Sequence, residues 1–229
     1  FLVHLERPRG RAHLQHGVTV TQSVPLALGS GAGSPALVLA LLPAMALGVR
    51  LRVDAPVSPL LLAGLELVQD VFASWFPRLS RVEIEAPPAR PEPRPTGRTA
   101  CFFSAGVDGF ATLQRHLCEI DQLVLLHGFD LDLERTEHRA VTEAHVERIA
   151  ADVGRELVVM QTDIRSFGDD YAPWHVFCGP VLAACAQLLE GVCDRMLIAS
   201  SNSHADFHHF GTNALTDPAP STEGVALAY

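Results

Sequence analysis

Residues 104–109 form a short run of small residues that is typical of an anion-binding loop. The run reads SAGVDG and lies between the apolar segment TACFF and a segment of helical periodicity. Small residues let the backbone approach phosphate oxygens closely, and the free N–H groups and dipole of a starting helix favour negative charge. Ser104 could add a hydroxyl donor. The glycines alone predict a phosphate-binding loop and a ligand-free strand-to-helix turn equally well.

Polar residues also follow three other apolar segments, where open α/β sheets bind their ligands at the carboxyl ends of strands. These candidates are His127, Gly128, Asp130, Thr162, Arg165, Ser200, Ser201, Asn202 and His204. An arginine at this edge could hold a phosphate or carboxylate through two parallel hydrogen bonds, which makes Arg165 a candidate catalytic residue. A surface ion pair is the alternative for Arg165, and an ordinary surface turn is the alternative for His127 and Gly128. We expect Thr162 and Ser200 to contact a nucleotide and Asn202 to contact the substrate.

Three histidines, His204, His208 and His209, have a spacing that is compatible with a metal site. No nearby set of carboxylates and cysteines completes a group of zinc ligands. Histidine titrates near neutrality, so we favour a catalytic base that deprotonates an attacking amine or ammonia, and His204 is the candidate.

A proline-rich segment near the end of the chain carries Asp217, Ser221, Thr222 and Glu223. It is too irregular for a core element, and loops of this kind commonly carry function. We predict that it returns over the site, that these four residues contact the substrate, and that Asp217 is also a ligand of Mg²⁺. Solvated loop charges are the alternative for Asp217 and Glu223.

The elements that would position these residues alternate after residue 98. The predicted strands cover residues 99–104, 122–129, 156–162 and 195–201. The predicted helices cover residues 108–117, 137–153 and 174–190. This alternation predicts an α/β fold with a doubly wound, mainly parallel sheet. In the first of these helices Phe110, Leu113 and Leu117 should face inward, and the last helix is apolar nearly all round, as for burial between layers.

A segment with five prolines, APPARPEPRPTGR at residues 86–98, is typical of an extended linker. We therefore predict a small α+β domain at residues 1–85 and a nucleotide-binding α/β domain at residues 99–229. The first domain should contain short strands and one amphipathic helix. Ser58 can cap that helix, and Pro59 suits its first turn.

The composition, with 48% hydrophobic and 19% charged residues, predicts a folded globular chain. The net charge of −9 and the lack of a basic stripe argue against a nucleic-acid partner. The five cysteines contain no CxxC pair, which favours a reducing cytoplasm over a disulfide framework. The longest apolar stretch, residues 36–47, is interrupted by Pro43 and is too short to span a bilayer, so we expect no membrane partner. A homodimer remains open.

The segment FSAGVDGF resembles the SGGxDS signature of PP-loop ATP pyrophosphatases, a superfamily that includes asparagine synthetase, GMP synthetase and argininosuccinate synthase. The resemblance implies ATP and Mg²⁺ as cofactors. It implies that Ser104, Ala105, Gly106, Val107, Asp108 and Gly109 cradle pyrophosphate, that Asp108 helps to hold Mg²⁺, and that His127 and Gly128 lie near the adenine. It extends to ALLPAM, VDAPVSPLLLAGLE, LLHGFDLDL and GTNALTDPAPSTEG, which resemble a less characterised branch with a small N-terminal domain.

Two positions depart from that signature: Ala105 replaces a glycine, and Gly109 replaces the final serine. Loss of the serine removes a hydroxyl donor whose bond to phosphate would contribute roughly 1.5–3 kcal/mol. The resemblance predicts an enzyme that adenylates a carboxylate or amide oxygen of a small-molecule substrate, releases pyrophosphate and transfers the product to an amine, ammonia or a sulfur nucleophile. The alternative is a degenerate ATP-binding module with a regulatory or scaffolding role.

Overall fold

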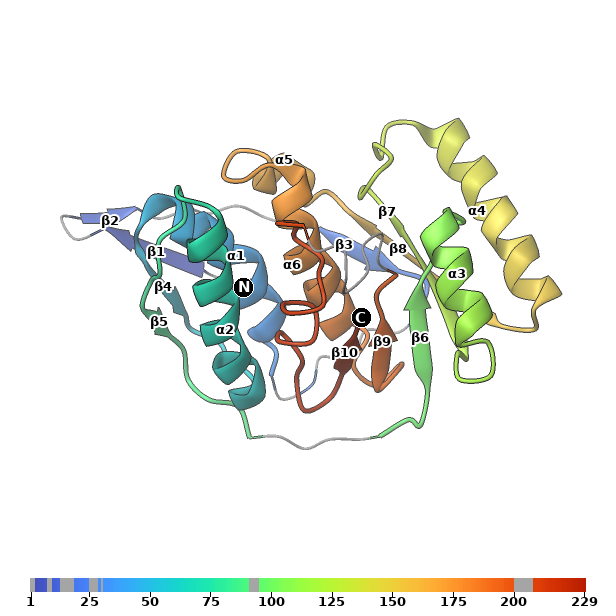
Figure 1. Cartoon of the computed structure of the whole chain (residues 1–229), viewed down its shortest axis with the longest axis horizontal. Coiled ribbons are helices and arrows are strands. Elements are labelled where there is room, and N and C mark those ends of the chain that lie inside the picture. Colours follow the sequence, from blue (N-terminus) through green and yellow to red (C-terminus); the bar gives the residue numbers. More distant parts are fainter. Residues whose placement is uncertain are drawn as a thin grey trace.

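The computed structural model describes residues 3–7, 10–12, 19–24, 29, 31–90, 95–199 and 208–229. The chain has an α/β fold whose larger sheet contains six strands in the order β10-β9-β6-β7-β8-β3 (Figure 1). These strands are β3 (Val20–Gln22), β6 (Thr99–Phe102), β7 (Gln122–His127), β8 (Glu156–Thr162), β9 (Arg195–Leu197) and β10 (Ala226–Ala228).

Five of the six strands are parallel, which confirms the predicted sheet. The pairs β6–β7, β7–β8, β6–β9 and β9–β10 are all parallel, and only β3, at the edge of the sheet, pairs with β8 in the antiparallel direction. From β6 the chain builds outward through β7 and β8, then returns to place β9 and β10 on the other side of β6. The strand order therefore reverses between β6 and β9, and such a switch point is where open α/β sheets bind ligands.

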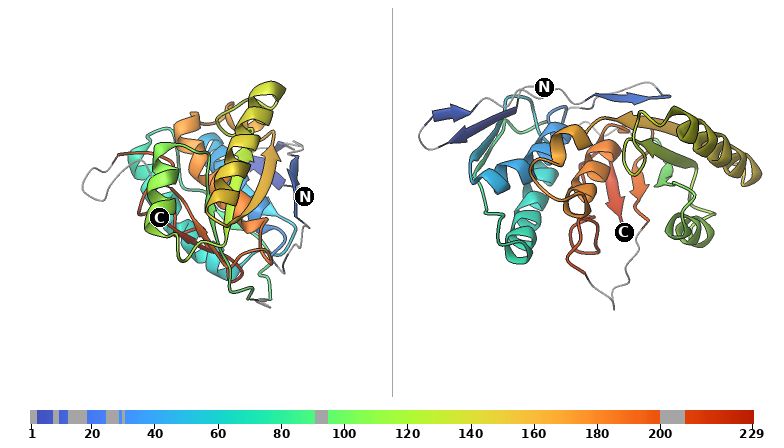
Figure 2. Two further views of the ribbon diagram at one scale, coloured as in Figure 1. Left: turned by 90° about the vertical axis from the view of Figure 1, so that its right-hand side faces the viewer. Right: turned by 90° about the horizontal axis from the view of Figure 1, so that it is seen from above.

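Helices cover both faces of this sheet (Figure 2). They are α3 (Val107–Arg115), α4 (Thr136–Asp152), the short α5 (Arg165–Gly168) and α6 (Trp174–Gln187). Alternate residues of β6 point to opposite faces, because Cys101 joins the core beneath α3 and α4 while Ala100 and Phe102 join the core beneath α6. The predicted burial of the last helix is confirmed, since every residue from Val176 to Gln187 is buried.

The N-terminal part of the chain forms a second sheet with the order β2-β1-β4-β5. Its elements are β1 (Val3–Arg7), β2 (Gly10–Ala12), α1 (Ser34–Leu47), β4 (Arg50–Val53), α2 (Pro59–Trp75) and β5 (Ile84–Glu85). Helix α1 packs against α6, and one hydrophobic core runs from α1 and α2 to α6 and the large sheet. The division of the chain at residues 86–98 stays a prediction.

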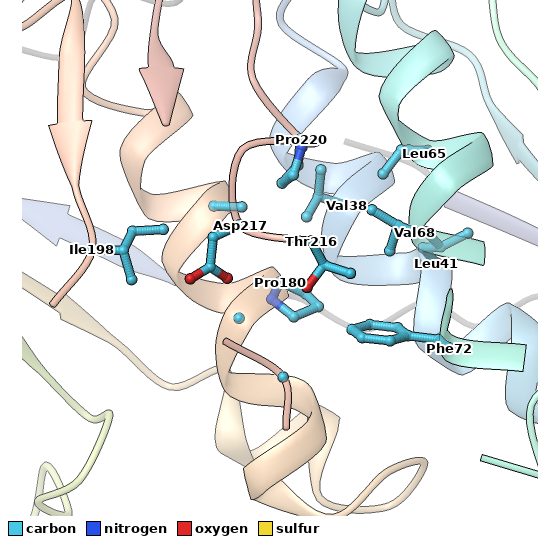
Figure 3. A pocket seen from close by; sticks show the side chains of 13 residues that line it. Val38, Leu41, Leu65, Val68, Phe72, Pro180, Ile198, Thr216, Asp217 and Pro220 are labelled. Carbon is cyan, nitrogen blue, oxygen red and sulfur yellow. The ribbon is translucent and has the colours of Figure 1, made fainter. Parts of the chain in front are cut away.

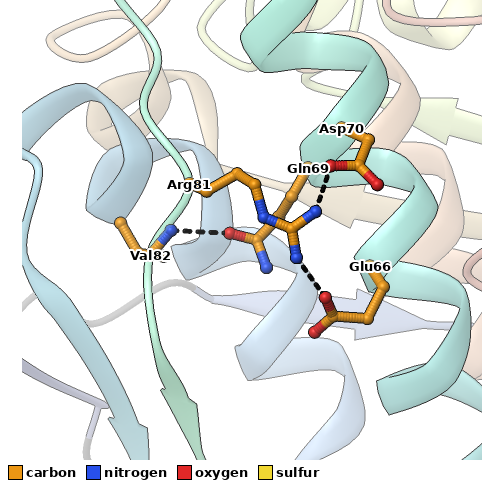
Figure 4. Close-up of polar contacts among 5 residues, drawn as sticks. All are labelled: Glu66, Gln69, Asp70, Arg81 and Val82. Atoms are coloured by element: carbon orange, nitrogen blue, oxygen red, sulfur yellow. Dashed lines mark hydrogen bonds and ion pairs between the residues drawn. The ribbon is translucent and has the colours of Figure 1, made fainter.

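Helix α2 begins as the sequence predicts and is tied to the segment that follows it. The Ser58 hydroxyl accepts a hydrogen bond from the Leu61 N–H at 3.0 Å. Figure 4 shows Arg81 paired with both Glu66 and Asp70 of α2, while the Gln69 side chain accepts a hydrogen bond from the Val82 N–H at 2.8 Å. These contacts fix the chain between α2 and β5.

One prediction about side-chain burial is wrong. Leu113 is buried, but Phe110 is 43% exposed and Leu117 is 37% exposed. Helix α3 ends at Arg115, so Leu117 lies beyond it, and Phe110 lies in the first turn, where its ring leans edge-on against Phe103. Only the middle of α3 faces the sheet.

No helix in the described ranges is both long and apolar enough to span a membrane.

Candidate functional site

The loop between β6 and α3 adopts a backbone conformation that favours glycine. Ala105 has φ of +61° and is the non-glycine residue with positive φ in the described part of the chain. A left-handed conformation costs an L-residue about 1–2 kcal/mol, and such strain tends to occur at functional loops. Ala105 thus adopts a conformation that glycine ordinarily occupies.

Gly106 is the N-cap of α3 and leaves the start of the helix open. No side chain caps this end, and a Cβ added at Gly106 would meet only the Ser104 hydroxyl oxygen at 3.5 Å. The first N–H groups of a helix lack intrahelical partners, so they can face an anion that approaches this surface. Ser104 and Gly106 are exposed, and Asp108 is half-buried in the first turn.

The location of this loop is set by the sheet. The Phe103 N–H donates to the Val124 carbonyl oxygen at 2.8 Å, which prolongs the pairing of β6 with β7 up to the loop. The loop leaves β6 at the point where the strand order reverses. The structure thus brings residues 104–109 to the switch point, where a ligand would find the exposed Ser104 and Gly106 and a helix start that no side chain caps.

Gly109, in contrast, has a packing role. A Cβ at this position would lie 3.1 Å from Phe103 Cδ2, and the Phe103 side chain is only 2% exposed. Gly109 itself is buried under that ring. A larger residue at position 109 would therefore require the buried Phe103 ring to shift.

The residues at the carboxyl ends of β7 and β8 contact each other and their neighbours. Gly128 has φ of +82°, and a Cβ there would lie 1.8 Å from the Thr162 carbonyl oxygen, so only glycine fits. The buried Thr162 hydroxyl accepts a hydrogen bond from the Ile164 N–H at 3.2 Å. The buried His127 ring hydrogen-bonds to Glu143 at 3.3 Å, and burial lowers the pKa of His127 although the Glu143 contact opposes this. These contacts hold the ends of β7 and β8 together, and the nucleotide roles of His127, Gly128 and Thr162 stay predictions.

Arg165 belongs to a cluster of aromatic and charged side chains at the same edge. Its guanidinium carbon lies 4.7 Å from the centre of the Trp174 ring, and Trp174 contacts Phe129 edge-on at 4.7 Å between ring centres. The Arg165 guanidinium also donates to Asp169 at 3.2 and 3.3 Å. Cation–π contact and ion pairing both orient this arginine. Phe129 and Trp174 were not among the predicted site residues.

Asp217 is buried beside a small cavity between α1, α2, α6 and the chain at 211–220 (Figure 3). Its side chain is 3% exposed, and Oδ2 has no hydrogen-bond partner in the described ranges. Burial raises the pKa of Asp217 to about 7, although a hydrogen bond from the Asn213 backbone opposes the shift. The alternative of a solvated loop charge is wrong for Asp217. The apolar surroundings do not suit a hydrated Mg²⁺, so this geometry gives the predicted metal role no support.

The other residues predicted in the final loop lie just before β10, toward the amino edge of the sheet. The Ser221 hydroxyl donates to the Pro218 carbonyl oxygen, and the Thr222 hydroxyl accepts from the Val225 N–H. Glu223 accepts a hydrogen bond from the Leu60 N–H at 3.0 Å and so caps α2. The structure does not group these three with residues 104–109, and their substrate role stays a prediction.

Ser200, Asn202 and His204 lie outside the described residues, so their predicted roles are untested. His209 stacks on Trp75 with 4.8 Å between ring centres, and His208 is exposed. No group of three potential metal ligands occurs in the described part of the chain. The zinc alternative is thus without support there.

Comparisons with family models, curated proteins and solved structures give no match to this chain. The fold and the geometry of the loop after β6 are therefore the basis for assigning a function.

Proposed function

We propose that the chain is an ATP-dependent adenylating enzyme that activates a carboxylate or amide oxygen of a small molecule and releases pyrophosphate. The observation that carries this proposal is the loop after β6. It lies at the reversal of strand order, contains Ala105 in a left-handed conformation, and leads to a helix start that no side chain caps. Those features suit a polyphosphate bound by backbone N–H groups.

The residues present fit ATP and Mg²⁺ at this loop. The open surface at Gly106 admits the close approach of phosphate oxygens, and Asp108 supplies a carboxylate in the first turn of α3. In the proposed reaction a substrate oxygen attacks the α-phosphorus, and the bond to pyrophosphate breaks. A nucleophile then displaces AMP. The protein contributes mainly positioning and stabilisation of developing charge.

A specific observation favours a second candidate, an ATP-binding module without turnover. A Cβ at Gly109 would lie 3.1 Å from the buried Phe103 ring, so a serine that supplies a hydroxyl to phosphate would fit here only if that ring shifted. Binding through the backbone N–H groups would survive this change. A transition state that needs the extra donor would lose stabilisation.

The two candidates are separated by measuring ATP binding and turnover in parallel. ATP labelled at the α-phosphate is incubated with Mg²⁺, ammonia and pools of small carboxylates and amides, and AMP and pyrophosphate are followed. Release of both products supports adenylation, whereas binding without release under any pool supports the second candidate. A chain that neither binds nor hydrolyses ATP contradicts both.

Matched variants assign any activity to the loop. Gly106→Val places a side chain in the proposed cradle at a backbone conformation, φ −78° and ψ 163°, that valine adopts readily. We expect it to weaken ATP binding at least about tenfold, the equivalent of one lost hydrogen bond. Ser80→Ala changes an exposed residue far from the loop in sequence and should leave binding unchanged.

A further inference from the structure

The cavity beside Asp217 is small and almost entirely apolar. Leu41 of α1, Phe72 of α2 and Pro180 of α6 line it, together with Thr216 and Asp217 (Figure 3). About 20 Å³ is open to the centre of a water-sized molecule. One water needs roughly 10–15 Å³ by this measure, so the cavity holds a ligand of one or two non-hydrogen atoms.

The one carboxylate in this cavity sets the charge of that ligand. Asp217 is 3% exposed, and its Oδ2 atom is buried without a hydrogen-bond partner in the described ranges. An ionised carboxylate in apolar surroundings is costly unless a cation pairs with it. Thr216 offers a second oxygen, but that atom already accepts a hydrogen bond from the Asn213 side chain at 2.6 Å.

We propose that this cavity binds ammonium, with methylammonium as the largest relative that it admits. Calcium and magnesium ions require about six oxygen ligands, and the lining side chains offer the oxygens of only Thr216 and Asp217. A water molecule is neutral and would leave the Asp217 charge unpaired. Ammonium matches the size of the cavity, donates hydrogen bonds to Oδ2 and neutralises the carboxylate.

This inference deepens the proposed function and rests on it for its catalytic meaning, because it assigns ammonia as the nucleophile. Bound ammonium transfers one proton to the Asp217 carboxylate, which leaves neutral ammonia and a carboxylic acid. The ammonia nitrogen then attacks the carbonyl carbon of the adenylated substrate, and the bond to the AMP oxygen breaks. The adduct releases one proton to solvent and becomes the amide, or the amidine where an amide oxygen was adenylated.

The cavity and the proposed ATP loop follow neighbouring strands of the sheet. Ile198, which lines it, directly follows Leu197 of β9, and Leu197 pairs with Cys101 of β6. Residue 104, where the loop begins, is three positions beyond Cys101. The cavity and the loop thus flank the same switch point of the sheet.

Ammonium binding is tested first without ATP, by thermal unfolding of the full chain in ammonium, methylammonium, potassium, sodium and tetramethylammonium chloride at equal ionic strength. The measurement is made at about pH 8, where Asp217 is ionised. Burial and the Asp217 charge raise the pKa of the neighbouring Cys178 thiol to about 12, so this thiol stays neutral at that pH. We expect the two smaller ammonium ions to raise Tm by about 3 °C relative to sodium, in a saturable way. Equal effects of potassium or tetramethylammonium overturn the proposal.

Variants locate the effect. Asp217→Asn and the cavity-filling Ala183→Val should both abolish the shift that is specific to ammonium, and the two are independent in case one fails to fold. Asp152→Asn changes an exposed carboxylate at the end of α4 and should keep the shift. If the ammonium-specific rise in Tm persists in both cavity variants, ammonium does not bind in this cavity and the proposal is wrong.

Turnover separates this inference from the proposed function. Ammonium binding at Asp217 without AMP formation under any substrate pool leaves the site standing and refutes adenylation. AMP formation whose KM for ammonia is unchanged in Asp217→Asn supports adenylation and refutes the site.

Discussion

Gly109 lies directly beneath the ring of Phe103, so that an added Cβ would come within 3.1 Å of Phe103 Cδ2. The ring is 2% exposed and contacts Phe110 edge-on at 5.1 Å between centres, so its room to move is limited. The residue type at position 109 is thereby coupled to a core aromatic residue.

Gly109→Ser should lower the free energy of unfolding by about 1 kcal/mol, because overpacking outweighs the gain in helix propensity. Urea unfolding measures the change. Phe103→Leu should reduce the cost of the serine in a double-mutant cycle. A rise in stability for Gly109→Ser alone would contradict the packing account.

Ala105→Gly should raise the free energy of unfolding by up to about 1 kcal/mol, since it relieves the left-handed strain at φ +61°. Ala144→Gly is the matched control, because Ala144 is exposed in the interior of α4 and the same substitution should there destabilise by about 1 kcal/mol. If the free energy of unfolding rises in Ala105→Gly and falls in Ala144→Gly, the left-handed conformation of Ala105 is supported. Equal losses would show that Ala105 is unstrained.

The sequence predicted best those elements whose signals are local. Strand β8 runs from Glu156 to Thr162 as predicted, because an apolar run is bounded there by turn residues, and α2 begins at the predicted Ser58 cap. Helix α1 was not predicted, because it is apolar on all sides and contains Pro43, so no amphipathic period marks it. The pairing of β3 with β8 depends on contacts between distant segments.

The candidate site also has one part that the sequence could predict and one part that it could not. The loop at residues 104–109 could be predicted from its small residues between a strand and a helix. The burial of Asp217 could not, because it results from α1, α2 and α6 closing around an irregular, proline-rich segment. Glu223 carries the same charge in the same segment, yet it caps a helix. Only tertiary packing distinguishes these two carboxylates.

Asp217→Asn should stabilise the protein above neutral pH in buffer free of ammonium. Burial raises the pKa of Asp217 to about 7, so the folded state keeps a proton that the unfolded state releases near pH 4, and stability falls as the pH rises between these values. The ionised, buried carboxylate lowers the free energy of unfolding by at most about 4 kcal/mol. This loss is complete above the pKa that Asp217 has in the folded state, and it is absent in the variant. Urea unfolding across this pH range should show the two proteins diverging with rising pH. Parallel curves would mean that Asp217 is not buried as described.

Glu223→Ala should destabilise the protein by about 1 kcal/mol, because it removes an acceptor from the first turn of α2. Although burial favours the neutral form, hydrogen bonds from the Ser58 hydroxyl and the Leu60 N–H lower the pKa of Glu223. The contribution of the charge is therefore present at neutral pH and is lost as the pH falls through the folded pKa. Glu223→Gln keeps an acceptor and should lose less stability than Glu223→Ala.

The same pair of variants tests whether Glu223 also contacts the substrate. A capping role predicts AMP release within about twofold of the unaltered chain at temperatures well below Tm, since α2 remains folded there. A loss above about tenfold in Glu223→Gln, without a matching loss of stability, would instead indicate transition-state contact by this carboxylate. Because Glu223 lies before β10 at the amino edge of the sheet, and the proposed ATP loop lies at the carboxyl edge, we expect the first result.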